Sequence, residues 1–418
     1  MRGEGEAIFC YQLRFPEHLR CVTHFIVLLF YSAFANTLFP TRYTPLAMKY
    51  YIIAGEASGD LHGSNLIKEI KKLDVSANIR CWGGDKMQEA GGELVKHYRE
   101  LAFMGFTEVL MNLRTIFKNL AFCKEDIIQY KPDAVILIDY PGFNLRIAKW
   151  AKQQGLKVIY YISPQVWAWK ENRVKSMKQC IDKMLVILPF EKNYFKDKWN
   201  WEVEYVGHPL VEVVNSHQLA VGSQQLSDRP IIALLPGSRK QEILKKLPVM
   251  LEVSKSFSSY QFIVAKAPGV DETFYDELLK NYSNVSYVSN KTYDLLMQSK
   301  AALVTSGTAT LETALFGVPE VVCYKGSYLS YQIGRRLVKV KYISLVNLIM
   351  DKLVVKELIQ NDFTREKLQQ ELNELLTNEK RKEQLKRDYT ELREILSTGG
   401  NASQKAASSI ISFLKSAT

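Results

Sequence analysis

Between Tyr50 and Asp60 the chain reads YYIIAGEASGD, an apolar run that leads into a turn of small residues. Uncharged runs rich in β-branched and aromatic side chains are typical of a strand buried on both faces, as in a parallel sheet. A helical pattern follows the turn over Asp60–Leu73. Strand, glycine turn and helix in this order predict the first unit of a parallel α/β sheet.

The same order returns in the second half of the chain. The apolar run Ile231–Leu235 is followed by the turn Pro236-Gly237-Ser238-Arg239 and by another helical stretch. Alternating strands and helices in both halves predict an α/β protein with two doubly wound domains. Further strands are expected at Ala134–Ile138, Val158–Ile162, Met184–Leu188, Gln261–Ala265, Ala301–Val304 and Val318–Cys323.

The length of 418 residues also favours two domains. We expect a first domain over residues 48–222 and a second over residues 223–418. Residues 1–47 are expected to be an extension outside the fold, because Met48 stands directly before the first strand. A targeting segment is the alternative, since the apolar stretch Phe25–Ala35 resembles a signal peptide and is too short to cross a bilayer.

The composition favours anionic partners. The formal net charge of +11 attracts phosphorylated small molecules, acidic membrane surfaces or nucleic acid. Nucleic acid is not expected, because no RNP, zinc-finger or helix-turn-helix signature is present. The six cysteines form no C-x-x-C pair and no disulfide framework of the secreted type, so reduced thiols in a cytosolic protein are expected, without a metal site.

The turn after Ala54 is a candidate anion site. Glycines let a ligand approach the backbone, and the amides at a helix N-terminus attract negative charge. The turn is neither G-x-G-x-x-G nor followed by a Walker lysine, which disfavours hydride transfer and ATP binding. The alternative is a tight turn in which Ser58 or Asp60 caps the helix. The candidate substrate-binding residues of this turn are Gly55, Glu56, Ser58 and Gly59.

Two turns of the second half suit a diphosphate. Arg239, in the candidate turn Gly237-Ser238-Arg239, offers paired charged hydrogen bonds, although a surface arginine is the alternative. The run Ser306–Glu312, SGTATLE, follows a strand and begins a helix whose amides and hydroxyls suit a phosphate. Glu312 lies four residues after Thr308 on the same helix face, where a carboxylate can accept ribose hydroxyls. The alternative is that Thr308 and its neighbours only start the helix.

Three features of the first half are further candidates. Asp139 follows the buried strand Ala134–Ile138, and open α/β sheets bind their ligands at the carboxyl ends of strands. Partial burial would raise its pKa toward the range of a general base, whereas capping of the following turn is the alternative. The segment Ser163–Lys170 carries two tryptophans, as a sugar or acyl platform or as a core plug. The loop residue His208 is a candidate for substrate binding or for a structural role.

Two helical patterns have an apolar face. The first is either a core-facing helix or an interfacial helix that dips into lipid. The second, near the C-terminus, would be covered by another domain or by a second subunit of a homodimer. The apolar residues are Phe106, Val109, Leu110, Leu113, Ile116 and Phe117 in the first pattern, and Ala407, Ile410, Ile411 and Leu414 in the second.

Eight segments together resemble the lipid-A-disaccharide synthase family. They occur in the family's order from about residue 49 to the end, which is far more specific than any single glycine turn. The segments are AGEASGD (Ala54–Asp60), FMGFTEVL (Phe103–Leu110), YISPQVWAWK (Tyr161–Lys170), LPFE (Leu188–Glu191), VGHPL (Val206–Leu210), LLPGSR (Leu234–Arg239), SGTATLE (Ser306–Glu312) and YISLVNLI (Tyr342–Ile349).

The resemblance implies a GT-B glycosyltransferase fold, in which two Rossmann-like domains face each other across a cleft, with the acceptor domain first and the UDP-sugar domain second. It implies an inverting transfer from UDP-2,3-diacylglucosamine to the 6-hydroxyl of 2,3-diacylglucosamine 1-phosphate, which gives lipid A disaccharide 1-phosphate and UDP. Asp139 is then the general base, with Asp60 in reserve, and Arg239 stabilises the leaving diphosphate. The remaining implied contacts are Ser306, Gly307 and Thr308 to the diphosphate, Glu312 to the ribose, and Asn347 in the same pocket.

The resemblance also implies no cofactor and no metal. Because acylated substrates reside in the bilayer, it favours membrane contact for the first apolar helix and an anionic membrane surface as a partner. The expected location is the cytoplasm, with peripheral attachment to the inner face of the cytoplasmic membrane. In one departure, relatives often carry a second acidic residue where this chain has Gly142, so the base assignment rests on Asp139.

Three alternatives remain open from the sequence. Another UDP-sugar enzyme of the same fold, such as a UDP-N-acetylglucosamine 2-epimerase or the muramyl-peptide glycosyltransferase, would act on soluble sugars or on a polyprenyl-linked acceptor. A Rossmann oxidoreductase is disfavoured by the missing dinucleotide fingerprint. The third alternative is a non-catalytic, membrane-associated nucleotide-binding module.

Overall fold

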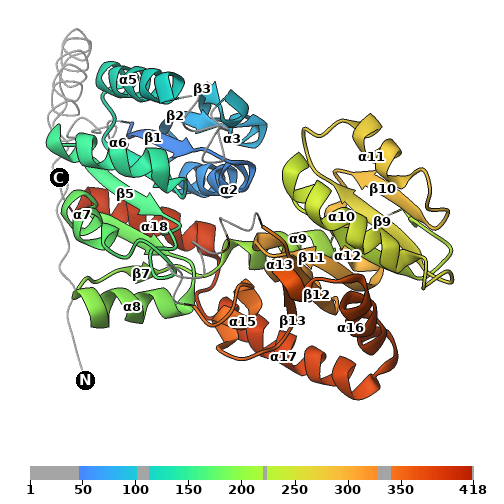
Figure 1. Cartoon of the computed structure of the whole chain (residues 1–418). Helices are drawn as coiled ribbons and strands as arrows, with labels where there is room; N and C mark the ends of the chain where they lie inside the picture. Colours follow the sequence, from blue (N-terminus) through green and yellow to red (C-terminus); the bar gives the residue numbers. More distant parts are fainter. Residues whose placement is uncertain (1–46, 101–112, 220–223, 327–330, 332–339, 417–418) are drawn as a thin grey trace, which may run out of the picture. The chain divides into compact units, whose positions relative to one another are not determined.

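Two parallel sheets alternate with helices along the chain (Figure 1). The computed structural model describes residues 47–100, 113–219, 224–326, 331 and 340–416. Within these residues the first sheet has seven strands in the order β3-β2-β1-β4-β5-β6-β7, and the second has six in the order β10-β9-β8-β11-β12-β13. The α/β class predicted from the alternating pattern is confirmed.

The first sheet draws its strands from the first half of the chain. They are β1 (Lys49–Ala54), β2 (Asn78–Gly83), β3 (Glu93–His97), β4 (Ala134–Ile138), β5 (Lys157–Tyr161), β6 (Lys183–Val186) and β7 (Glu204–Tyr205). The helices between and after these strands are α2 (Ala57–Leu73), α3 (Asp85–Glu89), α5 (Leu113–Tyr130), α6 (Pro141–Gln153), α7 (Arg173–Cys180), α8 (Pro189–Trp199) and α9 (Pro209–Leu219).

The second sheet repeats the arrangement. Its strands are β8 (Ile231–Leu235), β9 (Gln261–Lys266), β10 (Val285–Ser289), β11 (Ser299–Thr305), β12 (Glu320–Tyr324) and β13 (Lys356–Ile359). The helices of this half are α10 (Lys240–Ser254), α11 (Glu272–Leu279), α12 (Thr292–Gln298), α13 (Thr308–Leu315), α15 (Leu345–Met350), α16 (Arg365–Thr377), α17 (Glu379–Ser397) and α18 (Ala402–Lys415). Met48–Thr418, with both sheets, forms one compact unit.

Strand β1 shows why the apolar run is continuous. Tyr50 and Ile52 belong to a core cluster that includes residues of α2, whereas Tyr51 and Ile53 belong to a second cluster that includes residues of α5 and α6. Successive side chains of a strand point to opposite faces of the sheet. Because helices cover both faces, neither face of β1 has a polar position, and all four side chains are fully buried.

Helix α2 begins earlier than the sequence pattern indicates. Its N-cap is Glu56, in extended backbone, and the amide of Asp60 already bonds to the carbonyl of Glu56 at 2.9 Å. The alternative in which Ser58 or Asp60 caps this helix is therefore wrong. The carboxylate of Asp60 instead accepts bonds from amides at the start of α3.

The last helix returns to the first sheet. Figure 1 shows α18, drawn in red, beside the strands of that sheet, and α18 packs on α2. Its apolar residues Ala407, Ile410 and Leu414 lie in the same core cluster as Leu66 of α2. The apolar face noted in the sequence is thus buried against a domain of the same chain.

Two glycines permit this return. A side chain at Gly399, before α18, would place its Cβ 2.2 Å from the Cα of Gly207, which follows β7. The two backbones cross in direct contact there. Around the crossing, Tyr205 donates a hydrogen bond to the carbonyl of Leu396 at 3.3 Å, and the amide of Ser403 donates to Glu212 at 2.9 Å. The crossing therefore joins the segment that leaves the first sheet to the segment that comes back.

The first apolar helix of the sequence analysis is only partly described. Phe106, Val109 and Leu110 lie outside the described residues, as does the side chain of Leu113. Within α5, Ile116 packs partly against the core, whereas Phe117 is 61% exposed. In the described part of the chain, no helix combines the length and the apolarity needed to span a bilayer.

Candidate active site

A cavity of about 320 Å³ opens at the carboxyl ends of the strands of the first sheet. Asp139, the residue after β4, lies on its wall together with Ser58 and Gly59 of α2. Thr308, the first residue of α13, follows β11 of the second sheet and lines the same cavity. His208 from the loop before α9 lines it as well, and so does Trp169 of the predicted platform segment Ser163–Lys170.

The backbone at Asp139 is held in a conformation that side chains rarely adopt. Asp139 and Tyr140 both have positive φ angles, 43° and 48°, in the left-handed region. Such residues cost free energy and persist where the surrounding structure holds them. The carbonyl of Asp139 accepts hydrogen bonds from the side-chain amide of Asn144 at 2.8 Å and from the hydroxyl of Tyr160 at 2.6 Å. These bonds hold the backbone conformation of Asp139 and so fix the direction of its side chain.

The protonation of Asp139 suits a general base near neutral pH. The pKa of Asp139 is raised to about 7, mainly by burial and also by the negative charge of Glu56, while a hydrogen bond from the backbone of Tyr140 opposes the rise. Burial also raises the pKa of Glu56, against the opposing influence of Arg239. The turn after β1 therefore interacts with Asp139 on one side and with the turn after β8 on the other.

Sequence reasoning assigned no role to two further groups on the cavity wall. Glu191 of α8 is buried, and it accepts hydrogen bonds from the amide of Leu188 at 3.0 Å and from the indole of Trp167 at 3.2 Å. Burial raises the pKa of Glu191 to about 7, and the charge of Asp139 contributes. His62 of α2 is likewise buried on the wall. The segment LPFE was the available signal for Glu191, whereas nothing local distinguishes His62.

The two histidines of the cavity are neutral. Burial lowers the pKa of His62 to about 4. Burial, followed by the nearby His62, lowers the pKa of His208 to about 3. The Nδ1 atom of His208 accepts a hydrogen bond from the amide of Leu210 at 3.3 Å, which leaves the proton on Nε2. His208 thus combines a place in the cavity with a local structural bond.

The glycines of the first turn serve the packing of the protein itself. A Cβ atom at Gly55 would lie 2.3 Å from the ring of Tyr140, so the glycine makes room for that ring. A Cβ atom at Gly59 would approach Ala54 of β1 to 3.1 Å, which is a close contact between helix and strand. Both glycines were predicted to admit a ligand to the backbone. The close approach at Gly55 is made by a side chain of the same sheet edge.

The predicted diphosphate residues lie on the turns after β8 and β11. Arg239 is about half exposed and pairs with Glu242 at 2.9 Å, while its neighbour Ser238 is exposed. Gly237, whose φ is 122°, begins the same turn. The hydroxyl of Ser306 donates to the carbonyl of Ile343 at 2.9 Å. Gly307 is the N-cap of α13, so the amides that begin this helix are available at its start.

Glu312 has a partner of its own. The hydroxyl of Tyr293 donates to Oε1 of Glu312 at 2.8 Å. Burial raises the pKa of Glu312, and the Tyr293 hydrogen bond opposes the rise. A ribose at this position would therefore share the carboxylate with Tyr293.

Asp60 is committed to the fold. Its carboxylate accepts hydrogen bonds from the amides of Gly84 at 2.7 Å, Met87 at 3.1 Å and Lys86 at 3.2 Å. The side chain is 3% exposed. With both oxygens bound to backbone amides, Asp60 ties the turn after β1 to the start of α3. We therefore replace its assignment as the reserve base by a structural one.

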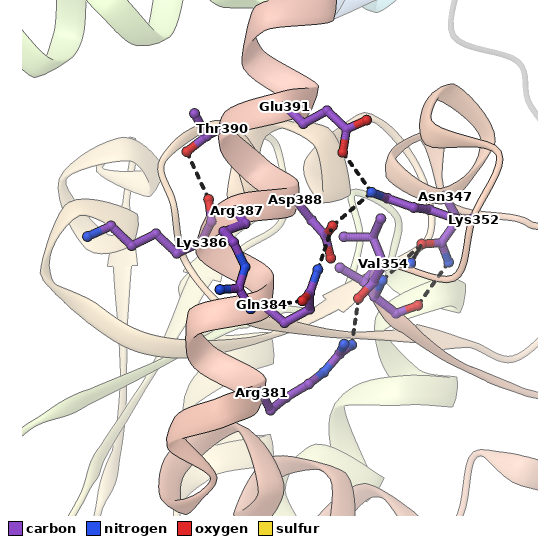
Figure 2. A network of polar contacts seen from close by, with 11 residues as sticks. Asn347, Lys352, Val354, Arg381, Gln384, Lys386, Arg387, Asp388, Thr390 and Glu391 are labelled. Atoms are coloured by element: carbon purple, nitrogen blue, oxygen red, sulfur yellow. Dashed lines mark hydrogen bonds and ion pairs between the residues drawn. The ribbon is translucent and has the colours of Figure 1, made fainter.

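The side chain of Asn347 forms its hydrogen bonds within its own half of the chain. Its side-chain amide donates to the carbonyl of Val355 at 2.8 Å and to Glu357 at 2.9 Å. Its oxygen accepts from the amides of Val354 and Val355 at 2.8 and 2.9 Å. Figure 2 shows Asn347 and Val354 beside α17, where Arg381 donates to the Val354 carbonyl. All four bonding positions of the amide are occupied, so the geometry gives Asn347 a structural role in place of the predicted place in the pocket.

The cysteines and the metal-ligating residue types add no further site. Four cysteines in the described ranges are free and buried, namely Cys81, Cys123, Cys180 and Cys323. Among the residues that the structure describes, no group of three His, Cys, Asp or Glu side chains could hold a metal ion.

The fold defines a class of proteins. The chain is similar in structure to the glycosyltransferase of kitacinnamycin, with a TM-score of 0.63 at 15% identity over 88% of this chain and 100% of that one. It is also similar to the calicheamicin glycosyltransferase, with a TM-score of 0.56 at 16% identity over 89% and 99% of the two chains. A UDP-GlcNAc 2-epimerase from Neisseria meningitidis shares the fold, with a TM-score of 0.54 at 14% identity over 89% and 100%. Two facing Rossmann-like domains of the GT-B type are common to this class.

The sequence comparison narrows the class to one family. The family model described as Lipid-A-disaccharide synthetase matches residues 50–411. The chain is 40% identical to the lipid-A-disaccharide synthase of Geobacter metallireducens, over 87% of this chain and 96% of the relative. It is also 40% identical to that of Syntrophus aciditrophicus, over 87% and 97%. The chain belongs to the lipid-A-disaccharide synthase family, as its motifs predicted.

The electrostatics of Asp139 can be tested directly. We expect the carboxyl of Asp139 to titrate near pH 7 in a ¹³C NMR experiment on aspartate-labelled protein, with Asp139→Asn used to assign the signal. Glu56→Gln removes a neighbouring negative charge, so the midpoint should move to lower pH. A midpoint near 4 in the wild-type protein, or one unmoved by Glu56→Gln, would contradict the assigned environment.

Proposed function

We propose that this chain transfers the sugar of UDP-2,3-diacylglucosamine to 2,3-diacylglucosamine 1-phosphate, the disaccharide-forming step of lipid A synthesis. The observation that carries the proposal is the cavity that Asp139, with its raised pKa, lines together with Thr308 at the start of α13. Family membership over residues 50–411 supplies the two substrates. The 2-epimerase alternative shares the fold with this chain at low identity and has no support from the sequence family.

Asp139 acts as the base in this reaction. It takes the proton of the acceptor's 6-hydroxyl, and the oxygen attacks the anomeric carbon of the donor sugar from the face opposite the diphosphate. The new C–O bond forms as the bond from the anomeric carbon to the diphosphate oxygen breaks, so the configuration is inverted. UDP leaves with the electron pair. A pKa of about 7 lets Asp139 accept a proton and release it again near neutral pH.

The leaving diphosphate is stabilised from the second domain. Arg239 and the free amides at the start of α13 are the donors, which act most strongly where negative charge develops during bond cleavage. The ion pair of Arg239 with Glu242 is at the surface, where such pairs contribute little, so the guanidinium can exchange partners when UDP binds. Glu312 binds the ribose with the oxygen that Tyr293 does not occupy.

The function is tested by release of UDP. The wild-type protein, given both acylated sugars, should form UDP and the disaccharide 1-phosphate in equal amounts. Each sugar given alone should yield little UDP, because the acceptor hydroxyl is the nucleophile. Conversion of UDP-N-acetylglucosamine without any acceptor would instead favour an epimerase. No turnover under any of these conditions would favour a non-catalytic nucleotide-binding module.

Arg239→Ala isolates the leaving-group contribution. We expect kcat to fall about 100-fold or more, the usual order when a donor to a developing negative charge is lost. Lys240→Ala is the matched control, because this neighbouring cation pairs with Asp271 at 3.0 Å. It should keep near-normal turnover. Equal rates for Arg239→Ala and wild type in the UDP-release assay would remove Arg239 from the mechanism.

The acceptor domain docks peripherally on an anionic membrane. Helix α5 supports this proposal, since Phe117 is 61% exposed beside the exposed cations Arg114 and Lys118. An apolar side chain flanked by basic residues is suited to a bilayer surface. The proposed location is accordingly the cytoplasmic face of the membrane. A homodimer through the C-terminal helices and the absence of nucleic-acid partners stay predictions.

Membrane docking through α5 is tested by sedimentation with liposomes. Phe117→Glu should lower the bound fraction severalfold on vesicles that contain anionic lipid. The variant replaces an apolar contact with the lipid by a negative charge that the anionic surface repels. Leu353→Glu changes a residue that is 55% exposed in the second half of the chain and serves as the control. If both variants bind like wild type, α5 is not the docking element.

A further inference from the structure

Two cations lie close to one tryptophan at the cavity described above. Trp169 lines the cavity, and the residue is 44% exposed. The ammonium group of Lys170 lies 4.3 Å from the ring centroid, and the guanidinium carbon of Arg173 lies 5.8 Å from it. Both positive charges are therefore held against the same ring, beside the cavity that contains Asp139.

Neither cation has an acidic partner among the described residues. Glu171 lies between them in sequence, but its carboxylate bonds to Lys198 at 2.5 Å and to the hydroxyl of Tyr194 at 2.8 Å. Partial burial lowers the pKa of Lys170, and the charge of Arg173 lowers it further. Two like charges that are held close together repel each other, and a bound anion relieves that repulsion.

The backbone around the two cations adds to the positive field. Lys170 has a φ of 55°, and its carbonyl accepts a hydrogen bond from the amide of Arg173 at 3.0 Å. Arg173 is the first residue of α7, and the N-terminal end of a helix dipole carries partial positive charge. The amide of the next residue, Val174, is bonded within the turn as well, to the carbonyl of Glu171 at 3.0 Å. A side-chain pair, a tight turn and a helix start thus converge on one place.

The remaining charges of the cavity decide which substrate group fits there. Asp139 and Glu191 are acidic groups on the wall, and Glu56 adds its charge beside Asp139. A phosphate is repelled by that part of the cavity. The donor diphosphate is already matched to Arg239 on the second domain. The acceptor of the proposed reaction carries a phosphate of its own, and it needs a separate cationic site on the first domain.

We propose that Lys170 and Arg173 bind the phosphate of the acceptor sugar beside Trp169. The inference rests on the proposed function for the identity of the acceptor. Phosphate bound at this place anchors the acceptor on the first domain, on the side of the cavity that belongs to Asp139. The pair would make the enzyme selective for a sugar 1-phosphate over the same sugar without phosphate.

The test compares two acceptors, 2,3-diacylglucosamine 1-phosphate and 2,3-diacylglucosamine, in the UDP-release assay. Lys170→Met and Arg173→Met should each lower kcat/KM for the phosphorylated acceptor about tenfold or more, since a charged hydrogen bond is lost. With the unphosphorylated acceptor both variants should match wild type. Lys175→Met removes an exposed cation further along α7 and should leave both values unchanged.

Two results would overturn the inference. One is a variant pair that keeps the full preference for the phosphorylated acceptor. The other is an equal loss on both acceptors, which indicates a general disturbance around Trp169. A ³¹P NMR titration with glucosamine 1-phosphate needs no turnover. With UDP added to fill the diphosphate site, wild type should broaden the sugar-phosphate signal, and the double variant should not. Broadening by the double variant overturns the inference, whereas binding without UDP release in wild type contradicts only the proposed function.

Discussion

Parallel strand pairing is the constraint on which the site depends. In the first sheet Ala54 of β1 pairs with Ile138 of β4, and Ile138 pairs with Tyr161 of β5. All three strands run in the same direction, so the segments that follow them leave the sheet side by side at one edge. In the second sheet Leu235 pairs with Val304, which brings the turns of Arg239 and Ser306 together in the same way.

The edge of the first sheet separates charge by burial. Asp139 and Glu191 lie deep enough that desolvation raises the pKa of each to about 7, whereas Lys170 remains exposed. Carboxylates that are costly to ionise are suited to exchanging protons. Exposed cations are suited to capturing phosphates, which stay partly hydrated. At this edge, exposed cations can therefore bind anions, and buried carboxylates can accept and release a proton.

Local patterns predicted the strands well and several side-chain roles poorly. Ala134–Ile138 was expected as a strand and is β4. A run of five apolar residues between polar ones is too short for a buried helix and has the length of a buried strand. Asp60 was expected to cap its own helix or to serve as a base, but its partners at Gly84 and Met87 lie more than twenty positions away. Asn347 was placed in the pocket by its motif, although its four hydrogen bonds hold a loop. Such pairings depend on the order of strands in the sheet, and a short stretch of sequence does not determine that order.

The sequence by itself determined the alternation of strands and helices, the positions of the glycine turns and the family. The first follows from the periodicity of apolar residues, the second from small residues between the elements, and the third from the order of the motifs. Tertiary structure alone decided which groups share the cavity and how they are charged. Asp139 acquires its raised pKa from burial and from Glu56, and Glu191 and His62 join it from helices far apart in the chain. Desolvation and Coulomb interactions act through space, so they become definite only when the chain has folded.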